Sequence, residues 1–153
     1  MEEACMSNIR PINLNLLAPC AELFAEVFNQ PPWNDQWTFE TATARLQVMY
    51  QTPHFYGLAY EEEGRLLGLV MGNSEVWYNG MHFKIVEFCV AGGQQRKGIG
   101  SQLLQALEAE LQQRDVTQIY FITGKGGDAE AFYRKHGYTV HSGLVVMTKR
   151  LCE

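Results

Sequence analysis

The sequence predicts a single α/β domain over residues 1–153, in which helices flank a central, mostly antiparallel mixed sheet. Three observations predict this fold class. Some segments repeat apolar residues at three- and four-residue spacing, which is typical of one helix face. Other segments are short apolar or alternating runs, which are typical of strands. The chain is 46% hydrophobic and 19% charged, so it can bury a core and is too apolar to be disordered.

The N-terminal third is expected to form a strand and two helices. Residues 9–14 read as a strand, and Pro11 places it at a sheet edge because proline has no N–H for the ladder. Residues 16–28 have the apolar spacing of a helix. The prolines at 31–32 end it. A threonine opens residues 38–50 and is a candidate N-cap for a second helix.

The middle of the chain changes to a strand pattern. Residues 55–60 and 65–75 flank a Glu-Glu-Glu-Gly turn, so they predict an antiparallel hairpin. Residues 83–90 (FKIVEFCV) form a third apolar strand, and the glycines at 92–93 interrupt it. The helix expected at 99–114 has its leucines on one face.

The last part of the chain is expected to return to the sheet. Residues 119–123 (IYFIT) read as a buried strand. A short helix at 129–136 follows, and Gly137 is suited to end it in a left-handed conformation. Residues 138–140 and 144–149 are predicted to pair as the final strands.

Charge and cysteine content exclude several classes of function. The net charge of −5 argues against a general nucleic-acid binder, which needs a surplus of Lys and Arg. Residues 1–76 carry a net charge of −7 and residues 77–153 carry +2. The four cysteines form no CxxC or zinc pattern, so we expect no metal site. The acidic N-terminus and the lack of a long apolar stretch predict no membrane segment and a cytoplasmic protein.

The strongest candidate for a binding site is the segment Gln95-Arg96-Lys97-Gly98-Ile99-Gly100-Ser101. It opens an amphipathic helix, where unpaired N–H groups and the helix dipole favour an anion. Its glycines let the backbone approach a ligand closely, and its Arg and Lys add positive charge. These features predict a phosphate site, although a plain glycine turn into a helix has the same residues. Neither a Walker A loop nor a Rossmann fingerprint is present.

Two motifs resemble one enzyme family. Residues 95–100 match the Q/R-x-x-G-x-G/A motif of the GNAT superfamily of acetyl-CoA-dependent N-acetyltransferases. Residues 129–138 (AEAFYRKHGY) are similar to the second signature of that superfamily. The predicted element order also resembles the GNAT order, which implies a sheet with a splayed strand pair. The resemblance is specific from about residue 83 to 140 and architectural before that.

The resemblance implies acetyl-CoA as the cosubstrate. The backbone of Phe88, Cys89 and Val90 would hold the pantetheine arm, and the Val90 N–H would polarise the thioester carbonyl. The pyrophosphate would bind the amides of Gln95, Arg96, Lys97, Gly98, Ile99, Gly100 and Ser101. One cofactor contact departs from the pattern, because Gly126 stands where the family often has asparagine.

Two residues are candidates for proton transfer. The resemblance places Tyr133 where a tyrosine protonates the departing thiolate. Glu87 lies inside an apolar run, where poor solvation raises the pKa of a carboxyl toward a useful range, so it is the candidate for taking a proton from the amine. Alternatively, Glu87 points outward or only binds a cation. Direct attack by the amine needs no enzyme nucleophile, and no Ser-His-Asp pattern is evident.

The acceptor side is predicted from a different loop. Residues 31–37 (PPWNDQW) resemble the loop that borders the acceptor pocket in this family. Trp33 and Trp37 are candidates for cation–π walls, and Asp35 for a counter-charge. The alternative is that both tryptophans anchor the loop on the core. Tyr78, in the loop after the strand predicted at residues 65–75, is a candidate for the opposite wall of the acceptor pocket.

These inferences predict an enzyme that transfers acetyl from acetyl-CoA directly to a primary amine of a small molecule or peptide. A small cationic acceptor such as an aminoglycoside or polyamine is the first candidate, in keeping with the acidic first half. The alternatives are a protein N-terminal or lysine acetyltransferase, a non-catalytic acyl-CoA-binding module, and a phosphate-binding domain for another nucleotide. The resemblance also allows a homodimer.

Overall fold

The computed structural model describes residues 8–95 and 97–152. They divide into two compact units, Met1–Phe121 and Ile122–Glu153. The sheet belongs to the first unit. Its strands are β1 (Ile9–Pro11), β2 (Phe55–Glu62), β3 (Arg65–Trp77), β4 (Gly80–Val90) and β5 (Val116–Tyr120).

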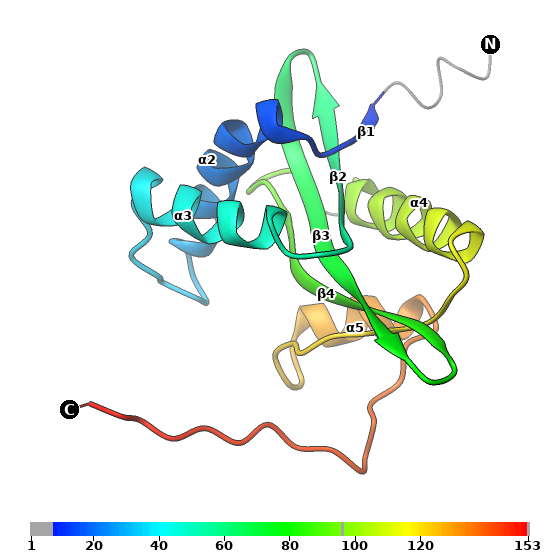
Figure 1. The fold of residues 1–153 in the computed structure, drawn as a ribbon. Coiled ribbons are helices and arrows are strands. Elements are labelled where there is room, and N and C mark those ends of the chain that lie inside the picture. The colour runs from blue at the N-terminus through cyan, green and yellow to red at the C-terminus, as the bar shows by residue number, and fades with distance from the viewer. Residues whose placement is uncertain (1–7, 96, 153) are drawn as a thin grey trace. The chain divides into compact units, whose positions relative to one another are not determined.

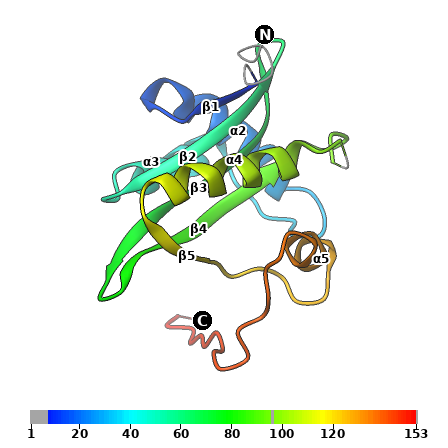
Figure 2. The same cartoon turned by 90° about the vertical axis from the view of Figure 1, so that its right-hand side faces the viewer.

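The strands of the first unit pair in sequence order, β1-β2-β3-β4-β5 (Figure 1; β5 is labelled in Figure 2). The first four strands are paired antiparallel to one another, and β5 is parallel to β4. The predicted mixed, mostly antiparallel sheet is therefore confirmed. β1 is an edge strand, as the proline within it requires.

Helices cover both faces of this sheet. The helices α2 (Leu17–Phe28) and α3 (Phe39–Tyr50) lie on one face, and α4 (Ile99–Gln113) lies on the other (Figures 1 and 2). A short 3₁₀ turn, η1 (Leu14–Leu16), precedes α2. Each long helix turns its apolar stripe inward, since burying that stripe is the main source of helix stability in a folded protein. The core residues of α4 are Ile99, Leu103, Leu104, Leu107 and Leu111.

The start of α3 follows the prediction from its N-cap. The Thr38 side chain accepts a hydrogen bond from the Thr41 N–H at 3.0 Å. The Thr41 hydroxyl accepts one from the Thr38 N–H at 2.9 Å. This reciprocal pair satisfies two backbone donors that the helix itself leaves unpaired.

Two predictions about the last strands are wrong. β5 spans Val116–Tyr120 rather than residues 119–123, and its side chains are half-buried or exposed because it is the terminal strand of the sheet. Residues 138–140 and 144–149 form no strand in the described part of the chain. An apolar run becomes a strand only when another strand pairs with its N–H and C=O groups. No strand of the described sheet pairs with these two segments, and Val145 is 81% exposed.

The second unit contains one helix within its described residues, α5 (Asp128–Lys135). Gly137 follows it at φ 92° and ends it, as predicted. The Gly137 N–H donates to the Arg134 carbonyl and the Tyr138 N–H to the Tyr133 carbonyl, each at 3.0 Å. This is the Schellman pattern. Among the described helices, none has the length and apolar character needed to cross a membrane.

Candidate active site

The parallel strands β4 and β5 separate halfway along β4. Their last paired residues are Lys84 and Tyr120, whereas β4 continues to Val90. The edge of β4 that faces β5 is therefore open from Ile85 onward. A backbone edge without a neighbouring strand presents hydrogen-bonding groups to a ligand. This is the splayed pair that the resemblance implied.

The backbone direction along this open edge follows from one hydrogen bond. The Ala91 N–H donates to the Leu67 carbonyl of β3 at 2.8 Å. Successive peptide groups of a strand point to opposite edges, so the N–H and C=O of Val90 point to the open edge. The Val90 carbonyl indeed accepts from Gln95 Nε2 at 2.9 Å on that side. By the same alternation, the backbone of Cys89 faces its partner Leu69 in β3.

The loop after β4 leads directly into the N-terminus of α4. The Gln95 side chain ties this loop together, because its Nε2 holds the Val90 carbonyl and its Oε1 accepts from the Gly93 N–H at 3.2 Å. Gly98 is the N-cap of α4 at φ 82°, a left-handed conformation that favours glycine. The amides of the first helical turn have no partner within the helix. Lys97 is exposed beside them, and Arg96 lies outside the described residues.

Glu87 reaches the face covered by α2 and α3 because of an irregularity in β4. Met71 of β3 pairs with Glu87, but the next residue, Gly72, pairs with Ile85. Val86 is therefore an extra residue in β4, and such a bulge re-aims the neighbouring side chains. Gly72 is required opposite the bulge, since an added Cβ would overlap the Lys84 carbonyl.

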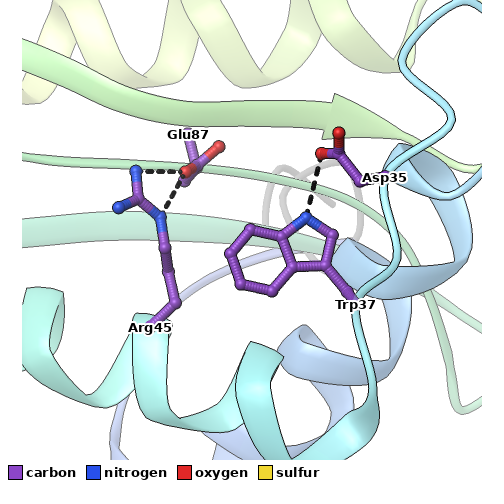
Figure 3. Close-up of polar contacts among 4 residues, drawn as sticks. All are labelled: Asp35, Trp37, Arg45 and Glu87. Atoms are coloured by element: carbon purple, nitrogen blue, oxygen red, sulfur yellow. Dashed lines mark hydrogen bonds and ion pairs between the residues drawn. The ribbon is translucent and has the colours of Figure 1, made fainter. Parts of the chain in front are cut away.

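The Glu87 carboxylate is paired with a cation of the same chain. Its Oε2 accepts hydrogen bonds from Nε and Nη2 of Arg45 at 3.0 and 2.8 Å (Figure 3). The Glu87 side chain is 12% exposed and that of Arg45 is 43% exposed. Burial raises the pKa of Glu87, Arg45 lowers it in part, and the charge of Asp35 raises it further. The net direction is upward, as the apolar neighbours of Glu87 in the sequence predict.

The loop between α2 and α3 holds Asp35 near this carboxylate. Trp37 Nε1 donates to Asp35 Oδ2 at 3.0 Å (Figure 3). The Trp37 ring packs edge-on against Phe24 of α2 with the ring centroids 4.8 Å apart. Trp33 packs in the same way on Phe28 at 4.9 Å. Both tryptophans therefore anchor the loop on α2, and Trp33 remains 50% exposed.

Tyr78 lies apart from the other candidates. It is 95% exposed at the tip of the β3–β4 hairpin. The stretch of β4 from Gly80 to Glu87 separates it from the carboxylate by roughly 20 Å at the usual rise of a strand. The structure thus brings Glu87 and Asp35 together and leaves Tyr78 at the far end of the hairpin.

Tyr133 lies on α5 of the second unit. Burial raises the pKa of its phenol, so the hydroxyl is protonated at neutral pH and can donate a proton. Gly126 precedes the helix at φ 78°, and its N–H donates to Glu130 Oε1 at 2.6 Å. The backbone of Gly126 is thus part of the capping of α5, which its sequence position did not indicate.

Arg45 is the site residue that the sequence did not reveal. It pairs with a residue 42 positions away, and nothing in its local pattern distinguishes it from a solvated helix residue. The described residues contain no group of three or more His, Cys, Asp and Glu side chains that could hold a metal ion. Burial raises the pKa of the Cys89 thiol well above its ordinary value, so Cys89 is not a thiolate nucleophile at neutral pH.

Comparisons with known proteins agree with this geometry. The acetyltransferase (GNAT) family profile matches residues 17–138. Among solved structures, an aminoglycoside acetyltransferase, meta-AAC0020, from an uncultured soil metagenomic sample in complex with sisomicin is 21% identical. The alignment covers 94% of this chain and 95% of that one, with a TM-score of 0.74.

Two further solved structures share the fold. A possible acetyltransferase from Clostridium difficile 630 is 15% identical over 94% of this chain and 97% of that one, with a TM-score of 0.79. The integron cassette protein VCH_CASS6 from V. cholerae is 15% identical over 93% and 91%, also at 0.79. No curated protein matches the sequence.

Proposed function

The chain belongs to the acetyltransferase (GNAT) family, and from this premise we propose that it transfers the acetyl group of acetyl-CoA directly to a primary amine of a small cationic acceptor. One observation carries the proposal. β4 turns the Val90 backbone to an open edge, and three residues earlier it turns the Glu87 carboxylate toward Asp35. A polarising donor and a proton acceptor thus come from one strand. The family profile spans both compact units, in keeping with one functional domain.

The residues at the end of β4 fit acetyl-CoA, the cosubstrate that the family implies. The open edge from Ile85 to Val90 offers backbone groups to the amides of a pantetheine arm. The α4 N-terminus offers amides that the helix leaves unpaired, and a positive dipole end, to a pyrophosphate. A side chain at Gly98 would strain the backbone that brings these amides close. Lys97 adds a positive charge at the same end.

The chemistry assigned to this chain needs three groups. Acetyl-CoA supplies an activated acetyl thioester when it is bound. The Val90 N–H binds the carbonyl oxygen, where negative charge develops. Glu87 takes a proton, directly or through water, from the amine that forms the new C–N bond as the C–S bond breaks. Tyr133 returns a proton to the departing sulfur, so the products are an amide and a thiol.

A cationic acceptor is favoured by the charges around Glu87. Asp35 and Glu87 carry two negative charges and Arg45 one positive charge. The site therefore keeps a net negative charge that attracts an ammonium group. The matched aminoglycoside acetyltransferase holds sisomicin, which supports testing aminoglycosides first. Polyamines belong in the same panel.

An acceptor panel tests the proposal. Aminoglycosides, polyamines and short peptides are each supplied with acetyl-CoA, and release of the CoA thiol is measured. A polycationic acceptor should show a KM that rises strongly with salt, because salt screens its attraction to the site. An N-terminal peptide acceptor should show little change, which would favour the protein acetyltransferase alternative. Absence of thiol release with every acceptor would overturn the proposal.

A tyrosine pair separates catalysis from simple binding. Tyr133→Phe should lose turnover and keep its affinity for CoA, because only the proton donor is removed. Tyr138→Phe is the matched control, since the family signature accepts either aromatic residue there. Equal turnover in both variants would remove Tyr133 from the mechanism. A protein that binds acetyl-CoA and shows no turnover in any form would be the non-catalytic module.

A further inference from the structure

The pairing of Arg45 with Glu87 is asymmetric. Both Nε and Nη2 of Arg45 donate to the same oxygen, Oε2, at 3.0 and 2.8 Å. A guanidinium facing a carboxylate commonly binds both oxygens, one to each nitrogen. In this site the other oxygen, Oε1, has no partner among the described residues. It points away from Arg45 (Figure 3).

Among the described residues, few charged groups act on Glu87 and its Oε1 atom. Asp35 is the negative group whose charge reaches Glu87, and Arg45 is the positive one. The thiols of Cys89 on β4 and Cys20 on α2 occupy the same face and stay neutral, because burial raises the pKa of each. Within the described part of the chain, Arg45 therefore neutralises one of the two carboxylates and leaves the other without a counter-ion. An incoming ammonium group would supply that missing charge.

The two partners of this pair differ in exposure. The charge of an exposed arginine is solvated by water, whereas a buried carboxylate depends on the groups beside it. The Arg45 side chain is 43% exposed, whereas Glu87 is 12% exposed. A largely buried carboxylate without a cation beside it would take up a proton. Arg45 therefore favours the ionised form of the Glu87 carboxyl.

We propose that Arg45 is a positioning residue for the acceptor: it holds Glu87 ionised by one oxygen, so that the other oxygen and Asp35 together bind the ammonium group of the amine. This proposal rests on the proposed acetyl transfer and deepens it. It places the acceptor between β4 and the α2–α3 loop. It also makes α3 part of the substrate site, although none of the predicted site residues lies on this helix.

The test compares Arg45→Gln and Arg45→Lys with the wild type. The acid limb of the pH profile of kcat/KM is measured with the best amine of the acceptor panel. The Glu87 carboxyl is titrated directly by carbon-13 NMR in the same proteins. Loss of Arg45 should move both midpoints upward by about one pH unit. At a pH below the midpoints of the wild type and the variant, kcat/KM of the variant should therefore be about tenfold lower than that of the wild type.

The controls separate positioning from folding. Arg45→Lys keeps the charge and should recover part of the shift. Arg10→Gln removes another ion pair of the first unit, Arg10–Glu61 at 2.6 Å, and should move neither midpoint. Thermal melts establish that each variant is folded. An active, folded Arg45→Gln whose acid limb and Glu87 titration match the wild type would overturn the positioning role.

Failure of the proposed function would look different. A wild-type protein that acetylates no amine would remove the reaction itself, whatever the NMR titration shows. A working enzyme in which only the Arg45 variants behave as wild type would remove Arg45 alone. A drop in kcat/KM without any shift in pH dependence would also count against positioning, because lost packing predicts that pattern.

Discussion

Gly72→Ala should destabilise the protein strongly, because the added methyl group meets backbone rather than a movable side chain. Gly72 lies on β3 opposite Ile85, where β4 carries its extra residue. A Cβ built on Gly72 is 2.9 Å from both the Lys84 carbonyl carbon and Phe83 Cε1, and closer still to the Lys84 oxygen. Ordinary van der Waals contact begins near 3.4 Å, so β3 and β4 would have to separate.

The expected loss of stability has two sources, the overpacking by the added methyl group and the ladder hydrogen bonds that it breaks. Overpacking in a closely packed interior costs about 1–3 kcal/mol. Each ladder hydrogen bond lost beside the bulge adds about 1 kcal/mol. A total of about 3 kcal/mol is therefore expected, against a stability of about 5–15 kcal/mol for a typical domain. The shift would also displace Glu87, since the bulge directs its side chain.

Two other glycines provide matched controls, and the stability of all variants is measured by denaturation. The close contacts of Gly68→Ala are with side chains, Leu103 Cδ1 at 2.9 Å and Ile99 Cγ2 at 3.1 Å, while the Cys89 carbonyl oxygen lies at an ordinary contact distance of 3.4 Å. The change should cost about 1 kcal/mol because the side chains can move. Gly92→Ala meets nothing within 4 Å and should stay within about 0.5 kcal/mol of the wild type. Urea unfolding measures all three. A Gly72→Ala protein no less stable than Gly68→Ala would mean that the two strands accommodate the added methyl group without separating.

Three further changes test other parts of the molecule. Glu87→Gln should lower kcat/KM about 100-fold, the usual range for a lost proton acceptor, while the dissociation constant of acetyl-CoA is unchanged by calorimetry. In the wild type, activity should fall as acid protonates Glu87. The midpoint should lie above about 4.3, the ordinary pKa of a glutamate, because burial raises the pKa of Glu87. A midpoint at or below that value would contradict this prediction. Gly98→Ala forces a residue with a side chain to adopt φ 82°, which should lower the free energy of unfolding by about 1 kcal/mol. It should also weaken acetyl-CoA binding. Thermal shift with and without acetyl-CoA measures both effects. Thr38→Ala removes the α3 cap and should cost about 1 kcal/mol in urea unfolding, with no change in acetyl-CoA affinity.

The elements that the sequence predicted well are those with local signals. The apolar stripe of α4, the Thr38 cap and the edge strand at Pro11 depend on spacing or on one residue's chemistry. The same holds for Gly137, whose left-handed conformation ends α5. The glycine-rich turn at residues 95–101 is likewise placed at a helix N-terminus by its own residues and by the leucine spacing that follows it.

The elements that the sequence missed depend on partners far along the chain. Residues 144–149 are as apolar as the other strands, but an apolar run cannot specify which edge it pairs with. The predicted bounds of β5 were wrong for the same reason, because the register of this strand is set by its pairing with β4. Tyr78 was assigned to the acceptor wall from its place in a loop, and only the length of the β3–β4 hairpin shows how far it lies from Glu87.

The resemblance to the family, the candidate phosphate-binding turn and the candidate acid and base groups could all be read from the sequence. Each of these is written in neighbouring residues. The direction of the Glu87 side chain could not be read from the sequence, because the extra residue Val86 changes the alternation of β4. Nor could the pairing of Arg45, on α3, with Glu87 be read from it. A carboxylate's charge state is set by burial and by the charges beside it, and both are products of packing between distant segments.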